Sequence, residues 1–194
     1  MYIPCMSTSE RLVEATRELL WDRGYVGTSP KAIQRRAGAG QGSMYHHFSG
    51  KPELALAAIG RTAHAMREAA EETFSGGGSA YERISAYLLR EREVLRGCPV
   101  GRLTMDPDVI ADPSLRAPVD ATIGWLRARL AEIVEEGVAG GEFAAGLDPA
   151  EVAATIVATV QGGYVLARAS GSPEAFDAGV RGLSALLGPR TATP

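Results

Sequence analysis

Long uninterrupted apolar runs are missing from this chain of 194 residues. None reaches the roughly 18 residues that a membrane-spanning helix needs, and the N-terminus lacks the basic and apolar regions of a secretion signal. Cysteine is scarce as well, because Cys5 and Cys98 are the only two. Thiols this far apart, in a chain without an export signal, are expected to stay reduced. We therefore expect a cytoplasmic protein with no membrane partner, whichever of Met1 and Met6 is its first residue.

Sequence motifs of known enzymes are also missing. The chain has no GxSxG, HExxH or CxxC pattern, and no glycine-rich phosphate loop followed by lysine. His46 and His47 are adjacent and so point to different sides of a helix, which argues against a metal site built from that pair. We predict that the protein is not an enzyme and carries no cofactor or metal.

Aromatic residues make up only 6% of the chain, whereas alanine and glycine are abundant. This composition favours helices over sheets, and the apolar residues recur at helical spacing without an internal repeat. Ser9 and Ser29 are predicted to begin helices, and Gly24 and Gly38 to end them. We predict an all-α fold with helices at residues 9–23, 30–37, 41–46, 52–74, 81–95, 118–138, 149–170 and 173–187, and short helical pieces between 98 and 116.

The formal net charge of −3 hides an uneven distribution of charge. Residues 23–52 contain no Asp or Glu, although the protein as a whole is acidic. A local basic face on an acidic protein is typical of a domain that binds phosphate groups, and a merely solvated surface is the alternative. The basic residues of this stretch are Arg23, Lys31, Arg35, Arg36 and Lys51.

Two short predicted helices, 30–37 and 41–46, are separated by the glycine-containing turn 38–40. This spacing is typical of a helix-turn-helix motif. Ile33 and Met44 are expected to pack between the two helices, which leaves the other side of the second helix free to enter the major groove of DNA. The side chains expected to face outward there are those of Gln41, Ser43, Tyr45 and His46.

Residues 28–54, TSPKAIQRRAGAGQGSMYHHFSGKPEL, resemble the signature of the TetR repressor family. The preceding helix, LVEATRELLWDRGY at residues 12–25, is similar to the helix that precedes this signature in the family. The AGxGQGSxYHHF form of this signature, followed by GCPVG at residues 97–101, resembles a subgroup similar to regulators of drug-efflux genes. The resemblance implies a protein that binds DNA as a dimer and responds to a ligand.

The same resemblance implies two helical domains with about nine helices in total. An N-terminal three-helix domain that binds DNA would cover residues 1–52. A larger domain for ligand binding and dimerisation would cover residues 53–188. Residues 189–194 are expected to form a disordered tail.

The chain departs from the family's pattern at three positions. Gln34 stands where the family commonly has a small alanine, and Pro52 stands where it usually has an acidic residue. Gly40 replaces a serine or threonine, and so removes a side-chain oxygen that would cap the recognition helix and contact a phosphate. None of these changes is expected to disable the motif.

The resemblance and the side-chain chemistry together imply roles at the DNA. Tyr45 offers a hydroxyl and Lys51 an ammonium beside the start of a long helix, and both groups suit phosphate. Gln41 and Ser43 can reach base edges, where glutamine prefers adenine. The alternatives are a core position for the Tyr45 ring and a solvated Gln41. The residues predicted to bind a double-stranded palindromic operator are Thr28, Lys31, Arg35, Gln41, Gly42, Ser43, Tyr45, His46, His47 and Lys51.

Members of the family bury a small molecule between helices, so a pocket is expected in the second domain. Trp125 and Tyr164 would supply aromatic walls, and Arg102 or Arg127 a polar anchor, for a mostly apolar effector. Plain core packing is the alternative for each apolar residue. The candidate ligand-binding residues are Met66, Tyr87, Leu88, Cys98, Met105, Ile123, Trp125, Leu126 and Tyr164.

One short recognition helix covers too few base pairs for useful specificity, so we expect a homodimer that reads two half-sites. The last two predicted helices suit a four-helix interface between subunits, because small and apolar residues recur there at helical spacing. The predicted interface residues are Ile156, Thr159, Val160, Gly163, Ala167, Phe176, Val180, Leu183 and Leu187.

These features predict a transcriptional repressor that a small, mostly apolar ligand releases from its operator. The alternative is a helical protein that binds a small molecule, or senses redox state through Cys98, without binding DNA. Pro99 would suit the first position of a helix with Cys98 as its cap, where the helix dipole stabilises a thiolate. A buried, inert Cys98 is the competing interpretation.

Overall fold

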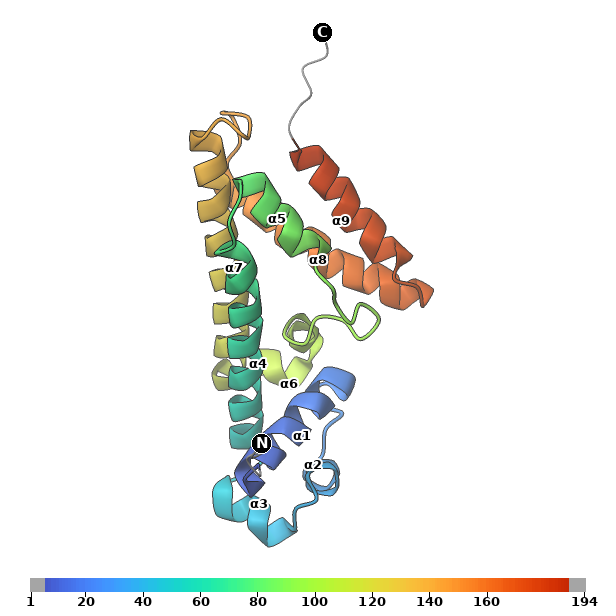
Figure 1. Ribbon diagram of the computed structural model, residues 1–194. Helices are drawn as coiled ribbons and strands as arrows, with labels where there is room; N and C mark the ends of the chain where they lie inside the picture. The colour runs from blue at the N-terminus through green and yellow to red at the C-terminus, as the bar shows by residue number, and fades with distance from the viewer. Residues whose placement is uncertain (1–5, 189–194) are drawn as a thin grey trace, which may run out of the picture. The chain divides into compact units, whose positions relative to one another are not determined.

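The structure is a computed structural model that describes residues 6–188, and the tail predicted at 189–194 lies outside the described residues. Over the described part, the chain forms nine α-helices and one 3₁₀-helix with no strand, so the predicted all-α class is confirmed (Figure 1). The elements are α1 (Thr8–Arg23), α2 (Pro30–Ala37), α3 (Gln41–His47), α4 (Lys51–Phe74), α5 (Ala80–Leu89), η1 (Gly101–Met105), α6 (Pro107–Ala111), α7 (Pro113–Ala139), α8 (Pro149–Ser170) and α9 (Glu174–Leu187).

The contacts divide the chain into two compact units. Unit 1 contains the described residues up to Ala65 together with Pro99–Thr122, and unit 2 contains Met66–Cys98 together with the described residues from Ile123 onward. The long helices α4 and α7 therefore each begin in unit 1 and end in unit 2. Residues 53–65 and 99–122 were predicted to belong to the second domain but lie in unit 1. A local sequence pattern contains no information about contacts with distant residues.

Local capping signals set the ends of the first helices. The Ser7 hydroxyl accepts a hydrogen bond from the Glu10 N–H at 3.2 Å, and the Glu10 carboxylate accepts one from the Ser7 N–H at 2.7 Å. Ser9 was the predicted cap and instead lies inside α1, because only Ser7 has a glutamate three residues further on. Ser29 begins α2 and Gly38, with φ 60°, ends it, as predicted.

Asp106 holds the turn between α1 and α2. Its side chain is 7% exposed, and Oδ2 accepts hydrogen bonds from the backbone N–H groups of Tyr25 at 2.6 Å and Val26 at 3.0 Å. Oδ1 accepts from the N–H of Val109 at 3.4 Å and so caps α6. Gly24 has φ 73°, and a Cβ there would lie 2.8 Å from Oδ2, so the turn requires glycine. Asp106 thus ties η1 and α6 to the first two helices within unit 1.

Unit 2 is built around one apolar core. Helices α5, α8 and α9 contribute to it, together with the C-terminal parts of α4 and α7. Helices α8 and α9 lie side by side (Figure 1). Burial of this apolar surface is the main source of stability for the unit. The core residues with no exposed surface are Phe74, Ile84, Leu88, Leu130, Ile133, Val134, Ile156 and Ala167.

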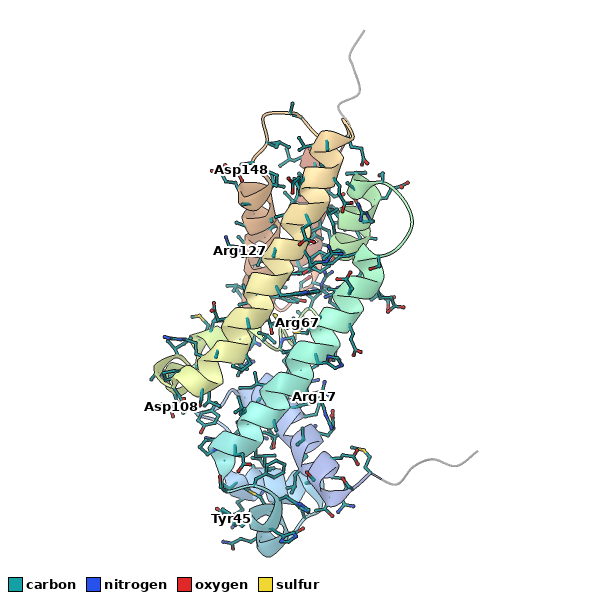
Figure 2. The ribbon with its side chains drawn as sticks, turned by 90° about the vertical axis from the view of Figure 1, so that its left-hand side faces the viewer. Arg17, Tyr45, Arg67, Asp108, Arg127 and Asp148 are labelled. Atoms are coloured by element: carbon teal, nitrogen blue, oxygen red, sulfur yellow. The ribbon has the colours of Figure 1, made fainter. Side chains whose placement is uncertain are left out.

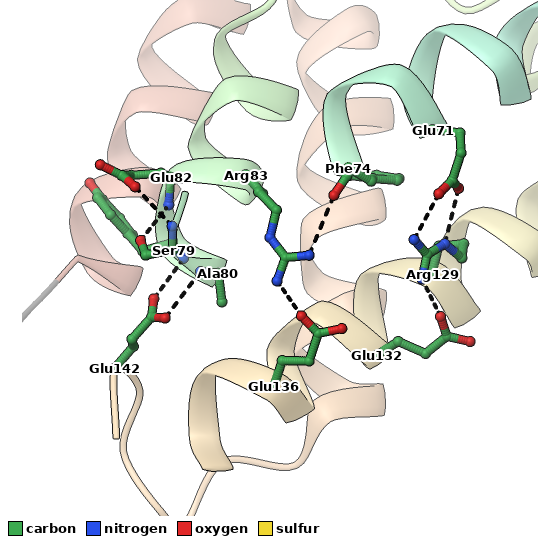
Figure 3. A network of polar contacts seen from close by, with 11 residues as sticks. Glu71, Phe74, Ser79, Ala80, Glu82, Arg83, Arg129, Glu132, Glu136 and Glu142 are labelled. Carbon is green, nitrogen blue, oxygen red and sulfur yellow. Dashed lines mark hydrogen bonds and ion pairs between the residues drawn. The ribbon is translucent and has the colours of Figure 1, made fainter. Parts of the chain in front are cut away.

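A polar network lies beside this core (Figure 3). Arg129 pairs with Glu71, with Nη2 2.8 Å from Oε1, and also with Glu132. Arg83 pairs with Glu136. Hydrogen bonds from Arg129 hold the pKa of Glu71 below its usual range. Because these groups are partly exposed, the pairs add little to the stability of the fold.

Most residues predicted for a dimer interface lie between helices of the same chain. Phe176 is 2% and Leu183 9% exposed, and a Cβ on Gly163 would lie 2.8 Å from the Phe176 ring. The predicted interface residues lie on the inner side of α8. Small and apolar residues occur on both sides of this helix, so periodicity alone cannot distinguish the side that faces the core from the side that faces solvent. Within the subunit, the buried members of the set are Ile156, Val160, Gly163, Ala167, Phe176, Val180 and Leu183, and Thr159 and Leu187 are half-buried.

Replacing Asp106 with alanine should destabilise unit 1, because the Tyr25 and Val26 N–H groups lose their acceptor. We expect the free energy of unfolding to fall by about 2–4 kcal/mol, measured by chemical denaturation followed with circular dichroism. Asp108→Ala, at an exposed position of α6, is the matched control and should change stability by about 0.5 kcal/mol or less. An Asp106→Ala protein as stable as this control would contradict the assigned role.

Candidate DNA-binding site

One buried side chain holds α3 in place. Met44 has no exposed surface and is the only buried residue of this helix. Gln34 Nε2, on α2, lies 3.4 Å from the sulfur of Met44, so the glutamine that departs from the family's pattern contacts α3 directly. Gly40 precedes α3 and supplies no side-chain cap, as predicted.

The opposite side of α3 faces solvent. The Tyr45 side chain is 49% exposed (Figure 2), so the alternative of a core ring is wrong. His46 and His47 are both exposed, with ring centroids 5.1 Å apart in an edge-to-face arrangement. Residues 41–43, at the start of the helix, are exposed or half-buried. The predicted DNA-binding residues of α3 therefore lie together on an open surface.

Helix α2 presents two cations beside this surface. Lys31 and Arg35 are exposed, and within the described part of the chain neither has an ion-pair partner, whereas Arg36 Nη2 lies 3.6 Å from Glu18 Oε2. Thr28 is only 1% exposed, and its hydroxyl donates to a backbone carbonyl of the preceding turn at 2.7 Å. Thr28 was predicted to contact DNA, but its hydroxyl is used to shape the turn before α2.

Lys51 lies against an aromatic ring at the start of α4. Its Nζ is 3.8 Å from the centroid of the Tyr25 ring, which is a cation–π contact. Partial burial lowers the pKa of Lys51, and the carboxylates of Asp106 and Asp108 oppose that shift. The ammonium is thus placed by Tyr25, and its binding to phosphate stays a prediction.

Most of the predicted ligand-binding residues belong to unit 2. The Tyr164 ring lies 4.9 Å from that of Phe176, and the Arg67 guanidinium lies 5.8 Å from the Trp125 ring. Arg127, one of the two predicted polar anchors, is exposed (Figure 2). Tyr87, Leu88 and Leu126 are buried in the core, Ile123, Trp125 and Tyr164 pack against it, and Met66 is half-buried.

Three residues considered for the ligand site or the redox site lie in surroundings that the sequence did not predict. Met105 lies in η1 of unit 1 and is 85% exposed, so it points to solvent. Arg102, the other predicted anchor, also belongs to unit 1. Cys98 is 6% exposed, and no helix begins at Pro99, because the next element is η1. The helix terminus that favoured a redox role for Cys98 is therefore absent.

Sequence reasoning missed Arg92, a cation that packs among aromatic rings in unit 2. Its Cζ lies 5.1 Å from the centroid of Tyr87 and 5.6 Å from that of Phe176. No sequence signal marks it, because an arginine among other charged residues near a predicted helix end resembles any solvated charge. It follows α5, which ends at Leu89 rather than near residue 95 as predicted.

Family comparisons cover both units. Residues 12–58 match the family described as bacterial regulatory proteins, tetR family, and residues 79–183 match the tetracyclin repressor-like C-terminal domain. The HTH-type transcriptional regulator LmrA of Bacillus subtilis (strain 168) is 28% identical over 165 residues, which cover 81% of this chain and 84% of LmrA.

Solved structures share the whole fold. A TetR transcriptional regulator from Chloroflexus aurantiacus J-10-FL has a TM-score of 0.83 and 29% identity, with 93% of each chain covered. A cysteine mutant of the TetR family regulator CifR, complexed with 26-bp double-strand operator DNA, has a TM-score of 0.78 and 22% identity over 95% of this chain and 98% of that chain. At this level of identity, the similarity to CifR concerns the fold alone. Because the family matches span the helix-turn-helix and most of the second helical region, the chain belongs to the TetR family of bacterial transcriptional regulators.

Proposed function

We propose that the protein is a repressor that binds a palindromic operator through α3. The observation that carries the proposal is the open side of α3, where burial of Met44 leaves Gln41 and Tyr45 facing solvent within a stretch free of acidic residues. A helix of this size fits the major groove. Gln41 and Ser43 would meet base edges, whereas Tyr45 and Lys51 would contact phosphates. The proposal includes a cytoplasmic location, because a bacterial operator lies in the cytoplasm.

The cations of α2 support the same docking. In a helix-turn-helix, the helix before the recognition helix crosses the DNA backbone. Lys31 and Arg35 are exposed there without an ion pair in the described part of the chain, so their charges are available to phosphates. Arg36 is turned toward Glu18 of α1, which offsets part of its charge. Two adjacent arginines on one helix thus have different expected roles.

Arg35→Ala should weaken binding to every duplex, because it removes a phosphate contact. The slope of log affinity against log salt should become shallower by about one unit. Fluorescence anisotropy at several salt concentrations, with a duplex selected from random sequences, measures this slope. Arg36→Ala is the matched control and should change the slope less. Equal salt slopes for the two variants would show that Arg35 has no special place at the DNA.

A homodimer that uses the outward faces of α8 and α9 is the second part of the proposal. By length and composition, α8 is apolar enough to cross a membrane, yet only 33% of that stretch is buried in its own chain. Val165 and Leu166 on α8 are 67% and 57% exposed, and Leu186 on α9 is 84% exposed. An apolar face of this kind marks an interaction surface.

A second copy of the chain is the occupant that fits this face. Ala158 and Gly162 are exposed one turn apart on α8, and a Cβ on Gly162 would meet nothing within 4 Å. Small residues at that spacing let two helices approach closely. A two-fold partner also supplies the second recognition helix that a palindromic operator requires.

Val165→Glu should convert the dimer to a monomer, because it places an unpaired charge in the interface. Size-exclusion chromatography with light scattering at micromolar concentration measures the mass. Val26→Glu is the control, because Val26 is similarly exposed, at 57%, but lies in unit 1. Leu183 is unsuitable for this test, because a charge there would disrupt the core of the subunit. A monomeric unmodified protein would contradict the dimer, and a dimeric Val165→Glu protein would contradict this face.

The third part of the proposal is that a small molecule bound in unit 2 releases the operator. Tyr87, Trp125 and Tyr164 gather aromatic surface there, as ligand sites commonly do. The ligand shifts the protein from its DNA-binding form only by its differential affinity for the two forms. Operator DNA must then weaken ligand binding by the same factor. A role in drug efflux stays a prediction.

A further inference from the structure

Arg92 is a partly buried cation without a counter-ion in unit 2. Its guanidinium lies between two aromatic rings, those of Tyr87 and Phe176. Among the described residues it forms no ion pair, whereas Arg83, Arg96 and Arg129 of the same unit each pair with a glutamate. The nearest carboxylates in sequence are no substitute, because Glu91 is exposed and Glu93 pairs with Arg96 at 3.7 Å. A charge buried in this way is costly unless something neutralises it.

Part of the Arg92 side chain has a structural role. Nη1 donates to the carbonyls of Leu88 and Arg90, both at 2.9 Å, and Nη2 donates to the carbonyl of Tyr87. These bonds satisfy carbonyls that the end of α5 leaves open. They use three of the five N–H donors of the guanidinium. The Nε–H is buried and has no partner among the described residues. Capping of α5 therefore leaves the Nε edge of the guanidinium without a hydrogen-bond acceptor.

A second arginine increases the positive charge at this point. Arg90 Cζ lies 4.9 Å from the Tyr87 ring, which Arg92 also contacts. Burial and the charge of Arg90 lower the pKa of Arg92. Burial raises the pKa of the Tyr87 and Tyr164 hydroxyls, against the effect of the arginines. Both tyrosines therefore stay neutral near pH 7 and cannot serve as counter-ions.

Two other arginines help to interpret this arrangement. The Nε atoms of Arg67 and Arg83 are also buried without a partner among the described residues. Arg83 has Glu136 as its counter-ion, so its charge is balanced. Arg67 lies over Trp125. Among these three arginines, only Arg92 combines an unpartnered Nε, a second cation on the same ring and two aromatic contacts.

We propose that unit 2 binds a small carboxylate, with the Nε edge of Arg92 holding the carboxylate oxygens and with the half-buried Tyr164 ring packing against an apolar body. The proposal rests on the proposed function, because it names the chemical class of the effector. A carboxylate matches the planar donor fork of arginine. It also supplies the missing negative charge, which a neutral ligand does not. A cationic ligand would add a third positive charge beside Arg90 and Arg92.

The test uses the full-length protein and a panel of straight-chain and aryl carboxylates of graded length, each paired with its own primary amide. Isothermal titration calorimetry measures the affinities without DNA. At least one carboxylate should bind roughly tenfold or more tightly than its amide. Arg92→Gln should abolish that preference, and Arg90→Gln should reduce it severalfold. Arg181→Gln, at an exposed position of the same unit, is the control and should bind like the unmodified protein.

Three results would overturn the proposal: no carboxylate of the panel binds, the amides bind equally well, or Arg92→Gln keeps the preference. Because Arg92 also caps α5, circular dichroism must show that its variant folds. If it does not fold, Arg90→Gln decides, since the Arg90 guanidinium donates no hydrogen bond to another described residue. An unchanged preference in Arg90→Gln would then contradict the site.

Operator binding separates this proposal from the one on which it rests. A protein that binds carboxylates through Arg92 but binds no duplex would refute the repressor and leave the site intact. A protein that binds an operator but no carboxylate would refute the site alone. If both hold, the carboxylate should weaken operator binding by the factor with which the operator weakens carboxylate binding.

Discussion

Seven residues are too few to form a stable helix in water, so α3 exists only because its neighbours hold it. Met44 supplies that hold, since it is the only buried residue of the helix and also contacts Gln34 on α2. Its burial fixes the rotation of α3 about its own axis. That rotation turns Gln41 and Tyr45 outward, and the contacts with DNA proposed for α3 follow from it.

Unit 1 is more than the helix-turn-helix, because a segment from the middle of the chain completes it. Asp106 joins this segment to the turn that precedes α2 by accepting a hydrogen bond from the Tyr25 N–H. The Tyr25 ring in turn contacts the Lys51 ammonium. The helices α4 and α7 run from this unit into unit 2.

Local signals predicted the parts of the structure that depend on neighbours in sequence. Ser29 and Gly38 set the ends of α2, and the helix-turn-helix followed from them. The failures needed distant contacts. Met105 was placed in a pocket and faces solvent, and Leu183 was placed in a dimer seam and lies in the core of its own subunit, because periodicity shows that a helix has an apolar side without showing what covers it. The sequence did not reveal the burial of Arg92, because that burial depends on rings such as Phe176 that are distant in sequence.

The central claim is that α3 reads DNA as one of a pair related by two-fold symmetry. Selection of bound duplexes from a random-sequence library by the purified protein, followed by sequencing, tests it most directly. We expect one enriched motif that is an inverted repeat, with half-site centres one helical turn of DNA or a multiple of it apart. Recovery of no enriched sequence, or of a single half-site without a symmetric partner, would contradict it.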